Sequence, residues 1–513
     1  MINRTALPGG SVPSERKNKF LFPIAALWGI VMLVILGLIT NDLSQDLTVQ
    51  RYYLLPWAFL TGLVVLVPAA YLLYRGEFDP CHPLVFVAWS YFLPAFCIGG
   101  TLLALGIVDE EHLTFVDNQK YNLPLTFVYI IVGFAGLVLG YGAPLGRYIG
   151  QKISRRLPVW NWTDETIWKP ALILFGLGML TTFWGFIEGL FGFQRSEQRE
   201  SYDGAIYLLT LLWSEACFVL WLLIWRARPM KRGHYFILAG LLITLLTRAA
   251  FAGSRGALWG SLIMILFAFI LSGRKITFRS AMVSGIAGVL LIIAGVIYGT
   301  TFREVKGDEA RMDIGSYAQL VPATFDKVTE ADALSNLGMA FDTLGNRMES
   351  VGVLSVVVAN YEKLAPEEKS YGIDNNIWYS TAYFLIPRIL WPEKPVAFEP
   401  HGYSDLYFNY RDTSFLITPI GDLLRNFGPI GVPLGMIFLG LLLRTLHTAF
   451  IADQEFSYWR ATLYYMVFSS LSLEGAFGFI IPTFFNVAFI SFVGLLLFRL
   501  ILGKGAKAGE IAA

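Results

Sequence analysis

Arg248 and Arg255 stand on either side of a Gly253-Ser254 hinge that joins two apolar segments. The span order derived below puts this hinge at the extracytoplasmic face, whereas Lys and Arg normally gather in cytoplasmic loops. A guanidinium group binds an oxyanion bidentately, and the free N–H groups at the start of the following helix also favour an anion. The hinge therefore predicts an anion site. The alternative is that both arginines snorkel to lipid headgroups or pair with loop carboxylates.

Further basic residues lie in predicted outer segments. Arg388 stands between prolines in the stretch IPRILWP, where the restricted backbone suits a fixed ligand contact. Arg347 and Arg425 each have a carboxylate within three residues, so a surface salt bridge is the alternative explanation for both. Arg195 and Arg199 occupy a short outer loop and are candidates for a second contact to an anion or to an acceptor.

Apolar runs must position these residues. The chain is 55% hydrophobic and 15% charged, with a mean hydropathy of +0.57. Runs of about 20 residues are long enough to cross the hydrocarbon core of a bilayer. The pattern predicts an all-α polytopic membrane protein with about twelve spans, at 20–39, 53–74, 83–107, 122–143, 170–191, 205–225, 234–247, 256–273, 281–300, 427–443, 458–473 and 479–501.

The charges favour one orientation of these spans. The first run follows four basic residues and lacks a small-residue cleavage site, which indicates a retained span with a cytoplasmic N-terminus. This orientation puts 22 of the 39 Lys and Arg inside and only six in short outer loops, because the other 11 lie in one long outer segment. Long translocated segments are exempt from the positive-inside rule. Both termini are expected in the cytoplasm.

The chain divides into helices over 1–300, an extracytoplasmic loop domain over 301–426, and helices with a cytoplasmic tail over 427–513. Within the loop domain, apolar residues recur at helical spacing from Leu334 to Met348 and predict a helix. Its second half is rich in Tyr, Trp, Pro and Asn, a composition that suits sugar binding. The alternative is an ordinary loop at the headgroup belt, where Trp and Tyr are enriched.

Several classes of site lack the residues that they need. Cys81, Cys97 and Cys217 provide neither a disulfide framework nor a zinc cluster. The sequence shows no phosphate-binding glycine-rich loop, HExxH motif or DxD-like sugar-nucleotide signature in a plausible context. These absences argue against a cytoplasmic nucleotide donor.

Three stretches carry a family resemblance: RAAFAGSRGALWGSLIMILFAFIL (248–271), IPRILWPEKP (386–395) and TPIGDLLRNFGPIGV (418–432). Together with the layout of spans, they resemble the Wzy-type oligosaccharide repeat-unit polymerases. The O-antigen ligases share the broader architecture. The resemblance implies a GT-C-like, all-α glycosyltransferase in the bacterial inner membrane that polymerises repeat units carried on undecaprenyl pyrophosphate. No cofactor and no nucleic-acid partner are expected, whereas membrane lipids and a chain-length regulator protein are expected partners.

The implied reaction assigns roles to the outer residues. Arginines stabilise the pyrophosphate released as the glycosyl bond breaks, and a general base assists the attacking hydroxyl. The expected base is Asp422 or His401, followed by Glu349 and then Glu474 or the intramembrane Glu215. The chemistry requires no metal. The expected pyrophosphate ligands are Arg248, Arg255, Arg388, Arg347 and Arg425, and the expected acceptor contacts are Arg195, Arg199 and Trp391.

Other functions stay open at this point. A ligase that transfers finished glycan once would share the layout. A flippase for lipid-linked oligosaccharide would also be polytopic, but we would expect its arginines to line a cavity across several spans. A structural partner in a polysaccharide complex would need neither the outer arginines nor a base. For Glu215, hydrogen bonding between helices is the structural alternative to a functional role.

Overall fold

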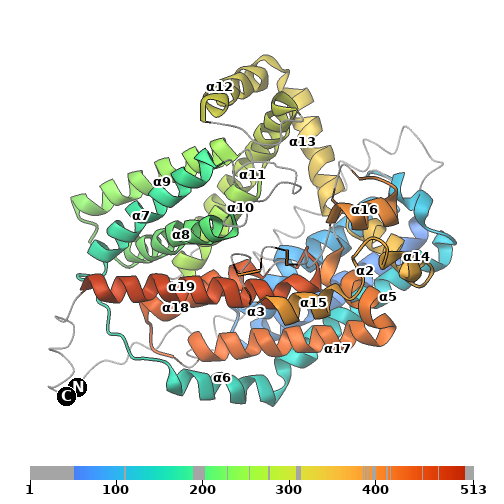
Figure 1. Ribbon diagram of the computed structural model, residues 1–513, viewed down its shortest axis with the longest axis horizontal. Helices are drawn as coiled ribbons and strands as arrows, with labels where there is room; N and C mark the ends of the chain where they lie inside the picture. The colour runs from blue at the N-terminus through green and yellow to red at the C-terminus, as the bar shows by residue number, and fades with distance from the viewer. Residues whose placement is uncertain are drawn as a thin grey trace.

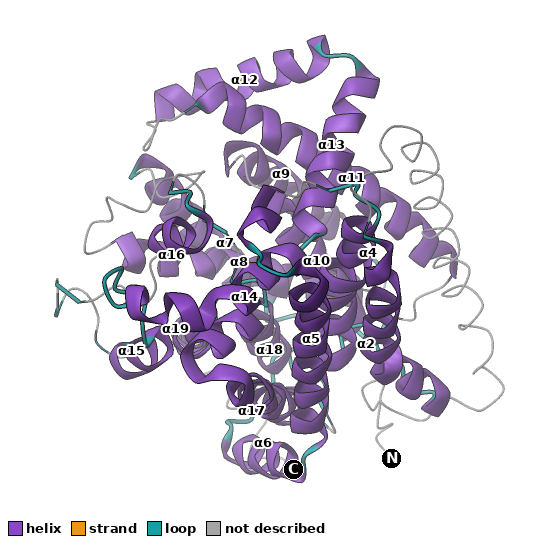
Figure 2. Ribbon diagram, turned by 90° about the vertical axis from the view of Figure 1, so that its right-hand side faces the viewer, coloured by secondary structure: helices purple, strands orange, loops and turns teal. Residues whose placement is uncertain are grey.

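The computed structural model is built from helices (Figure 1). The part of the chain that the structure describes contains no strand (Figure 2). The predicted first span, 20–39, lies outside it. The described residues are 51–108, 111–188, 203–227, 229–252, 255–274, 278–307, 314–384, 386, 390–391, 393–394, 400–411, 414–415, 417–452, 454–471 and 473–502.

Nine helical stretches in these ranges are long and apolar enough to span a membrane, which confirms a polytopic α-helical membrane protein. Two further predicted spans, 256–273 and 458–473, correspond to the shorter helices α10 (Arg255–Leu271) and α18 (Tyr458–Ser470). The nine stretches are formed by α2 (Leu55–Arg75) with the short η2 (Tyr52–Leu54), α3 (Pro83–Val87) continuing into η3 (Ala88–Ile98) and α4 (Gly99–Ala104), α5 (Gln119–Gly142), α7 (Trp168–Ile187), α8 (Asp203–Arg226), α9 (Arg232–Ala252), α11 (Phe278–Lys306), α17 (Thr418–Phe450), and α19 (Ile480–Leu502) with η6 (Phe477–Phe479).

Polar contacts define the two ends of the helix bundle. At one end, the Arg51 N–H donates to the Ala104 carbonyl (2.8 Å), and Arg51 Nε donates to Gln119 Oε1 (3.1 Å). At the other end, the Tyr141 hydroxyl bonds to His82 Nε2 (3.0 Å) and to His447 Nδ1 (2.8 Å). At each end, the bonded residues are ones that the predicted span order puts on the same side of the membrane. We call them the Asp422 end and the His447 end, after residues of α17.

Helices α5 and α17 pack closely because small residues line their interface. A Cβ atom added to Gly140 would lie 2.0 Å from the Ile437 carbonyl oxygen, and one added to Gly440 would lie 2.1 Å from the Leu137 carbonyl oxygen. Only glycine allows the two backbones to approach this closely, as in other membrane helix pairs. This interface holds α17, and the polar residues at its start, in a fixed position.

The start of α17 folds back on the rest of that helix. Gly428 has φ 67° and ψ −166°, which breaks the helical path. The first segment, Thr418–Phe427, therefore returns along the second, and a Cβ atom added to Gly435 would lie 2.2 Å from a side-chain carbon of Leu423. The result is a helical hairpin that buries the polar face of its first segment within protein, where polar groups can be satisfied.

The predicted loop domain contains α12 (Ile314–Glu330), α13 (Ala333–Met348), α14 (Val351–Glu368), α15 (Asn376–Tyr383) and α16 (Pro400–Phe408). Helix α13 confirms the helix expected from Leu334 to Met348. Helices α12 and α13 lie at the top of both views and pack against α11, and α13 also contacts η3 and α4 (Figures 1 and 2). Helix α14, in contrast, packs against α5 and α17, and the Ser350 N–H just before it donates to the Ala95 carbonyl of η3 (3.3 Å). Much of the segment is therefore joined to the bundle.

Two elements complete the fold. Helix η4 (Glu111–Phe115) precedes α5 and lies beside α14 and α16 at the Asp422 end. Helix α6 (Pro144–Arg156) follows α5 directly and lies along the last turns of α17 at the His447 end (Figure 1).

Candidate functional site

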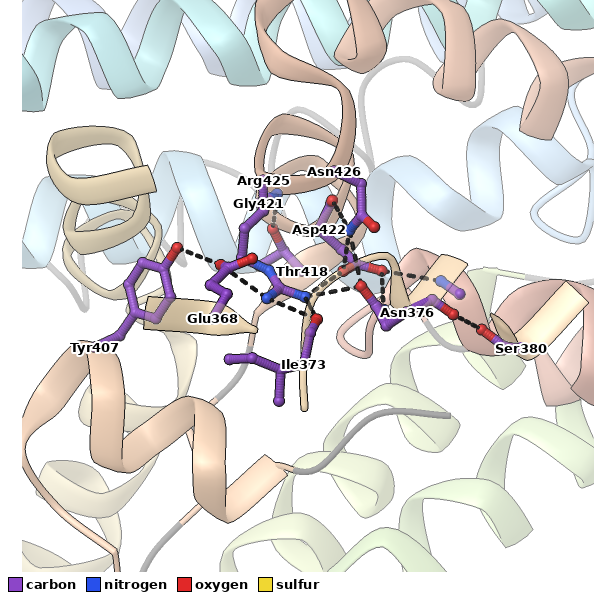
Figure 3. A network of polar contacts seen from close by, with 11 residues as sticks. Glu368, Ile373, Asn376, Ser380, Tyr407, Thr418, Gly421, Asp422, Arg425 and Asn426 are labelled. Atoms are coloured by element: carbon purple, nitrogen blue, oxygen red, sulfur yellow. Dashed lines mark hydrogen bonds and ion pairs between the residues drawn. The ribbon is translucent and has the colours of Figure 1, made fainter. Parts of the chain in front are cut away.

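Asp422 lies at the centre of a buried polar network at the start of α17 (Figure 3). Its Oδ2 accepts from Asn376 Nδ2 (3.2 Å) and from the Gly478 N–H (2.9 Å). Its Oδ1 accepts from Arg425 Nη2 (3.2 Å) and from Asn426 Nδ2 (3.1 Å). Four donors therefore hold one carboxylate and tie together α15, α17 and η6.

Arg425 joins the same network to α14 and to the loop that follows it. Its Nη1 lies 2.9 Å from Glu368 Oε1, and both terminal nitrogens donate to the Ile373 carbonyl (3.2 and 3.3 Å). The alternative considered from sequence, an ion pair with Asp422, is present, but it is buried instead of lying at the surface. Burial makes the pair costly to break, because the remaining charge would lose its partner in a water-poor site.

Burial also shifts the acid–base behaviour of the groups around Arg425. It raises the pKa of Glu368, while the positive charge of Arg425 acts in the opposite direction. The Tyr407 hydroxyl donates to Glu368 Oε1 (2.7 Å), and burial raises the pKa of Tyr407 far above its ordinary range. Tyr403, also on α16, places its ring 5.9 Å from the Arg425 guanidinium. Tyr403 and Tyr407 together cover this side of the network. The arrangement therefore suits a rigid anchor for α14, α15 and α17.

A second charged group brings together residues from three separate elements. Arg303 comes from the end of α11, Arg347 from the end of α13, and Glu474 from the loop between α18 and η6. The guanidinium of Arg347 acts electrostatically on both Arg303 and Glu474. The like charges of Arg303 and Arg347 repel each other, and a bound anion would offset that cost. The group therefore has the charges of an oxyanion site with a carboxyl at its edge.

Glu474 differs from Asp422 in its surroundings. Its side chain is solvent-accessible, yet the crowding of protein atoms around it raises its pKa, and Arg347 opposes this shift. Accessibility together with a raised pKa is what a general base or acid near neutral pH requires. Glu474 is linked to the buried network through the chain, since Gly478, four residues later, donates to Asp422.

Aromatic side chains lie on α15, beside the network. Trp378 is 62% exposed and Tyr379 is 42% exposed, although Asn376 of the same helix is buried next to Asp422. Tyr379 stacks on Tyr383 with ring centroids 6.0 Å apart, and Tyr383 meets the half-buried Trp391 edge to face at 5.2 Å. Trp391, an expected acceptor contact, therefore belongs to an aromatic row that offers faces for stacking on a sugar.

The two arginines of the hinge have different surroundings. Arg248 lies one turn before the end of α9, inside the helix instead of in the loop, and its guanidinium is 4.4 Å from the ring centroid of Trp213 on α8. Arg255 begins α10, but its side chain lies outside the described residues. The predicted contacts Arg195, Arg199 and Arg388 also lie outside them.

Two other expected base candidates have partners inside the protein. Glu349 is buried, accepts the Gly352 N–H (2.6 Å) and lies 3.5 Å from His112, so it caps the start of α14. His401 is the second residue of α16, and its Nδ1 lies 2.9 Å from the Arg411 carbonyl oxygen. The structure therefore brings neither residue into the group formed by Arg347 and Glu474.

Glu215 lies inside α8, fully buried, and no hydrogen-bond partner for its carboxyl is found in the described ranges. A Cβ atom added to Gly494 of α19 would lie 2.1 Å from Glu215 Oε2, so glycine makes room for the carboxyl between the two helices. Glu215 stays a candidate functional residue, because a carboxyl group buried inside a membrane-spanning helix costs free energy.

Comparisons with family models, with curated proteins and with solved structures find no match to this chain. The functional argument therefore depends on the geometry alone. In the described ranges, no group of three or more His, Cys, Asp or Glu side chains is placed to hold a metal ion. Sequence reasoning missed Arg303 and Glu368. Arg303 could have been found from its position just after the predicted span 281–300, whereas the pairing of Glu368 with Arg425 has no sequence signal.

Proposed function

We propose that this protein is a membrane glycosyltransferase that polymerises oligosaccharide repeat units carried on undecaprenyl pyrophosphate. The observation that carries the proposal is the electrostatic interaction of Arg347 with both Arg303 and Glu474, which come from three separate elements. In this proposal the Asp422 end faces the outside of the bacterial inner membrane, where lipid-linked repeat units are presented, and both chain termini are cytoplasmic.

The roles follow from the charges. Arg303 and Arg347 bind the pyrophosphate and stabilise the negative charge that develops as the glycosyl bond breaks. Glu474 accepts the proton of the attacking sugar hydroxyl, because it is accessible and its raised pKa makes it a stronger base than an ordinary carboxylate. The new glycosidic bond forms at the anomeric carbon, and the lipid pyrophosphate leaves. Arg248 and Arg255, at the end of α9 and the start of α10, are further candidates for contact with the lipid-linked phosphate.

Asp422 and Arg425 are positioning residues in this proposal. Their network fixes α15, which carries Trp378 and Tyr379, and the loop that carries Glu474. The exposed rings offer faces on which the glycan can stack, and a fixed loop keeps the carboxyl at a constant distance from the arginines. A chain-length regulator protein is a further proposed partner.

The test is reconstitution of the purified protein in liposomes with an undecaprenyl-pyrophosphate-linked repeat unit. Chain growth supports the proposal, whereas a single transfer indicates a ligase and translocation without new bonds indicates a flippase. Glu474→Gln should lower turnover by roughly 10²- to 10⁴-fold with little loss of bound substrate. Arg347→Gln should also lose substrate retention. Lys363→Gln, which removes a charge of the exposed pair with Asp117, is the matched control and should keep wild-type turnover.

A further inference from the structure

A pocket lies at the His447 end, where α6, the end of α17 and the start of α18 meet. Its volume is about 330 Å³, and its described lining includes Arg155 and Arg460. Two positive charges therefore face one space. An anionic group is the ligand that such a lining favours.

The pocket is held in shape by its own polar contacts. Arg460 Nη1 donates to Ser154 Oγ (3.0 Å) and to Gln454 Oε1, so one guanidinium links α6 to the loop after α17. The Thr448 hydroxyl also lines the pocket and is buried, and no hydrogen-bond partner for it is found in the described ranges. A hydroxyl in this position can donate to a ligand oxygen. Arg155 is exposed and supplies the second charge at the rim.

Helix α6 shows what kind of anion reaches this pocket. The helix follows the spanning helix α5 directly, and its first half exposes the apolar side chains of Leu145 (54%), Tyr148 (64%) and Ile149 (39%). Its last turn carries Arg155 and Arg156. Apart from Arg147, the helix thus changes from apolar to basic along its length. This order fits a helix that crosses from the acyl chains into the headgroup layer of a bilayer.

We propose that this pocket binds the phosphate of an anionic phospholipid headgroup. The lipid phosphate lies between Arg155 and Arg460, and the acyl chains cover the apolar side chains of the first half of α6. Basic pockets between membrane helices bind anionic headgroups by the same combination of charge and adjacent apolar surface. The site is at the opposite end of the bundle from Asp422, so it is separate from the proposed catalytic group.

Thermal unfolding of the purified full-length protein in detergent tests the proposal. The probes are dioctanoyl phosphatidylglycerol, dioctanoyl phosphatidylcholine and sn-glycerol 3-phosphate. Phosphatidylglycerol should raise Tm in a saturable way, because a ligand that binds only the native state stabilises it, and phosphatidylcholine should do so much less. Arg155→Gln should weaken the apparent affinity for phosphatidylglycerol about fivefold, which corresponds to about 1 kcal/mol. Lys152→Gln, on the same helix but outside the pocket lining, should leave that affinity unchanged.

The variants remain informative because Arg155 is exposed, so its substitution should not prevent folding. Equal stabilisation by phosphatidylcholine would overturn the preference for an anionic headgroup. An equal loss of affinity in Arg155→Gln and Lys152→Gln would indicate diffuse attraction to basic residues and would also overturn the proposal. Binding of sn-glycerol 3-phosphate as tightly as phosphatidylglycerol would identify a site for a soluble phosphate compound and refute the lipid assignment.

Discussion

Replacement of Asp422 by Ala should destabilise the protein more than replacement of any exposed carboxylate. The substitution removes one of the two carboxylates that pair with the buried Arg425 in the described ranges. It also removes the acceptor for Asn376 Nδ2 and for the Gly478 N–H. Removal of one partner from a buried pair costs about 3–5 kcal/mol. The loss in the free energy of unfolding should therefore be among the largest that single substitutions cause.

The matched control is Asp117→Ala, which breaks the exposed pair with Lys363. An exposed pair contributes about 0–1 kcal/mol, so the two variants should differ by roughly 3 kcal/mol. Equilibrium unfolding in detergent, followed by tryptophan fluorescence, measures both values under the same conditions. If Asp422→Ala and Asp117→Ala lose similar stability, the network is not the anchor described above, and the positioning role given to Asp422 would have to be abandoned.

The remaining predictions concern proton binding, packing and topology. The protein atoms crowded around Glu474 raise its pKa, so its contribution to stability is present below its ordinary value of 4.5 and is lost as pH rises through the native value. Glu474→Gln should therefore be more stable than the wild type at neutral pH but not below about pH 4.5, as Tm against pH would show; a constant difference would contradict this. Gly435→Ala should cost about 1–3 kcal/mol in the unfolding assay, because the hairpin leaves no room for a methyl group, whereas Gly142→Ala, with nothing within 4 Å, should cost little. Cysteines at Lys363 and Lys152 should be labelled from opposite sides of the membrane; labelling from one side would refute the two-ended arrangement.

The spanning helices could be predicted from the sequence because hydrophobic length is a local property. A run such as Gln119–Gly142 must cross the bilayer wherever its neighbours lie. The helix from Leu334 to Met348 was also predictable, since its apolar residues recur at helical spacing. The proximity of Asp422 and Arg425 followed from their separation by three positions on one helix.

Burial and long-range partners could not be derived in this way. Only the fold brings Glu368 to Arg425 and Gly478 to Asp422, because these residues are 57 and 56 positions apart in the sequence. The same holds for Arg347. The sequence favours a pair between Arg347 and a nearby carboxylate such as Glu349, whereas in the structure Arg347 acts electrostatically on Glu474.

The turn at Gly428 shows the physical reason most clearly. From the sequence, the stretch NFGPIGV is the segment at which a predicted span begins, and its two glycines and one proline are compatible with several backbone conformations. Packing of the returning segment against α5 and the rest of α17 selects one of them, and that choice buries Asp422. Chain-local chemistry determined which residues are apolar, charged or flexible. Tertiary packing decided which charges meet, because the energy of a charge depends on what surrounds it in space.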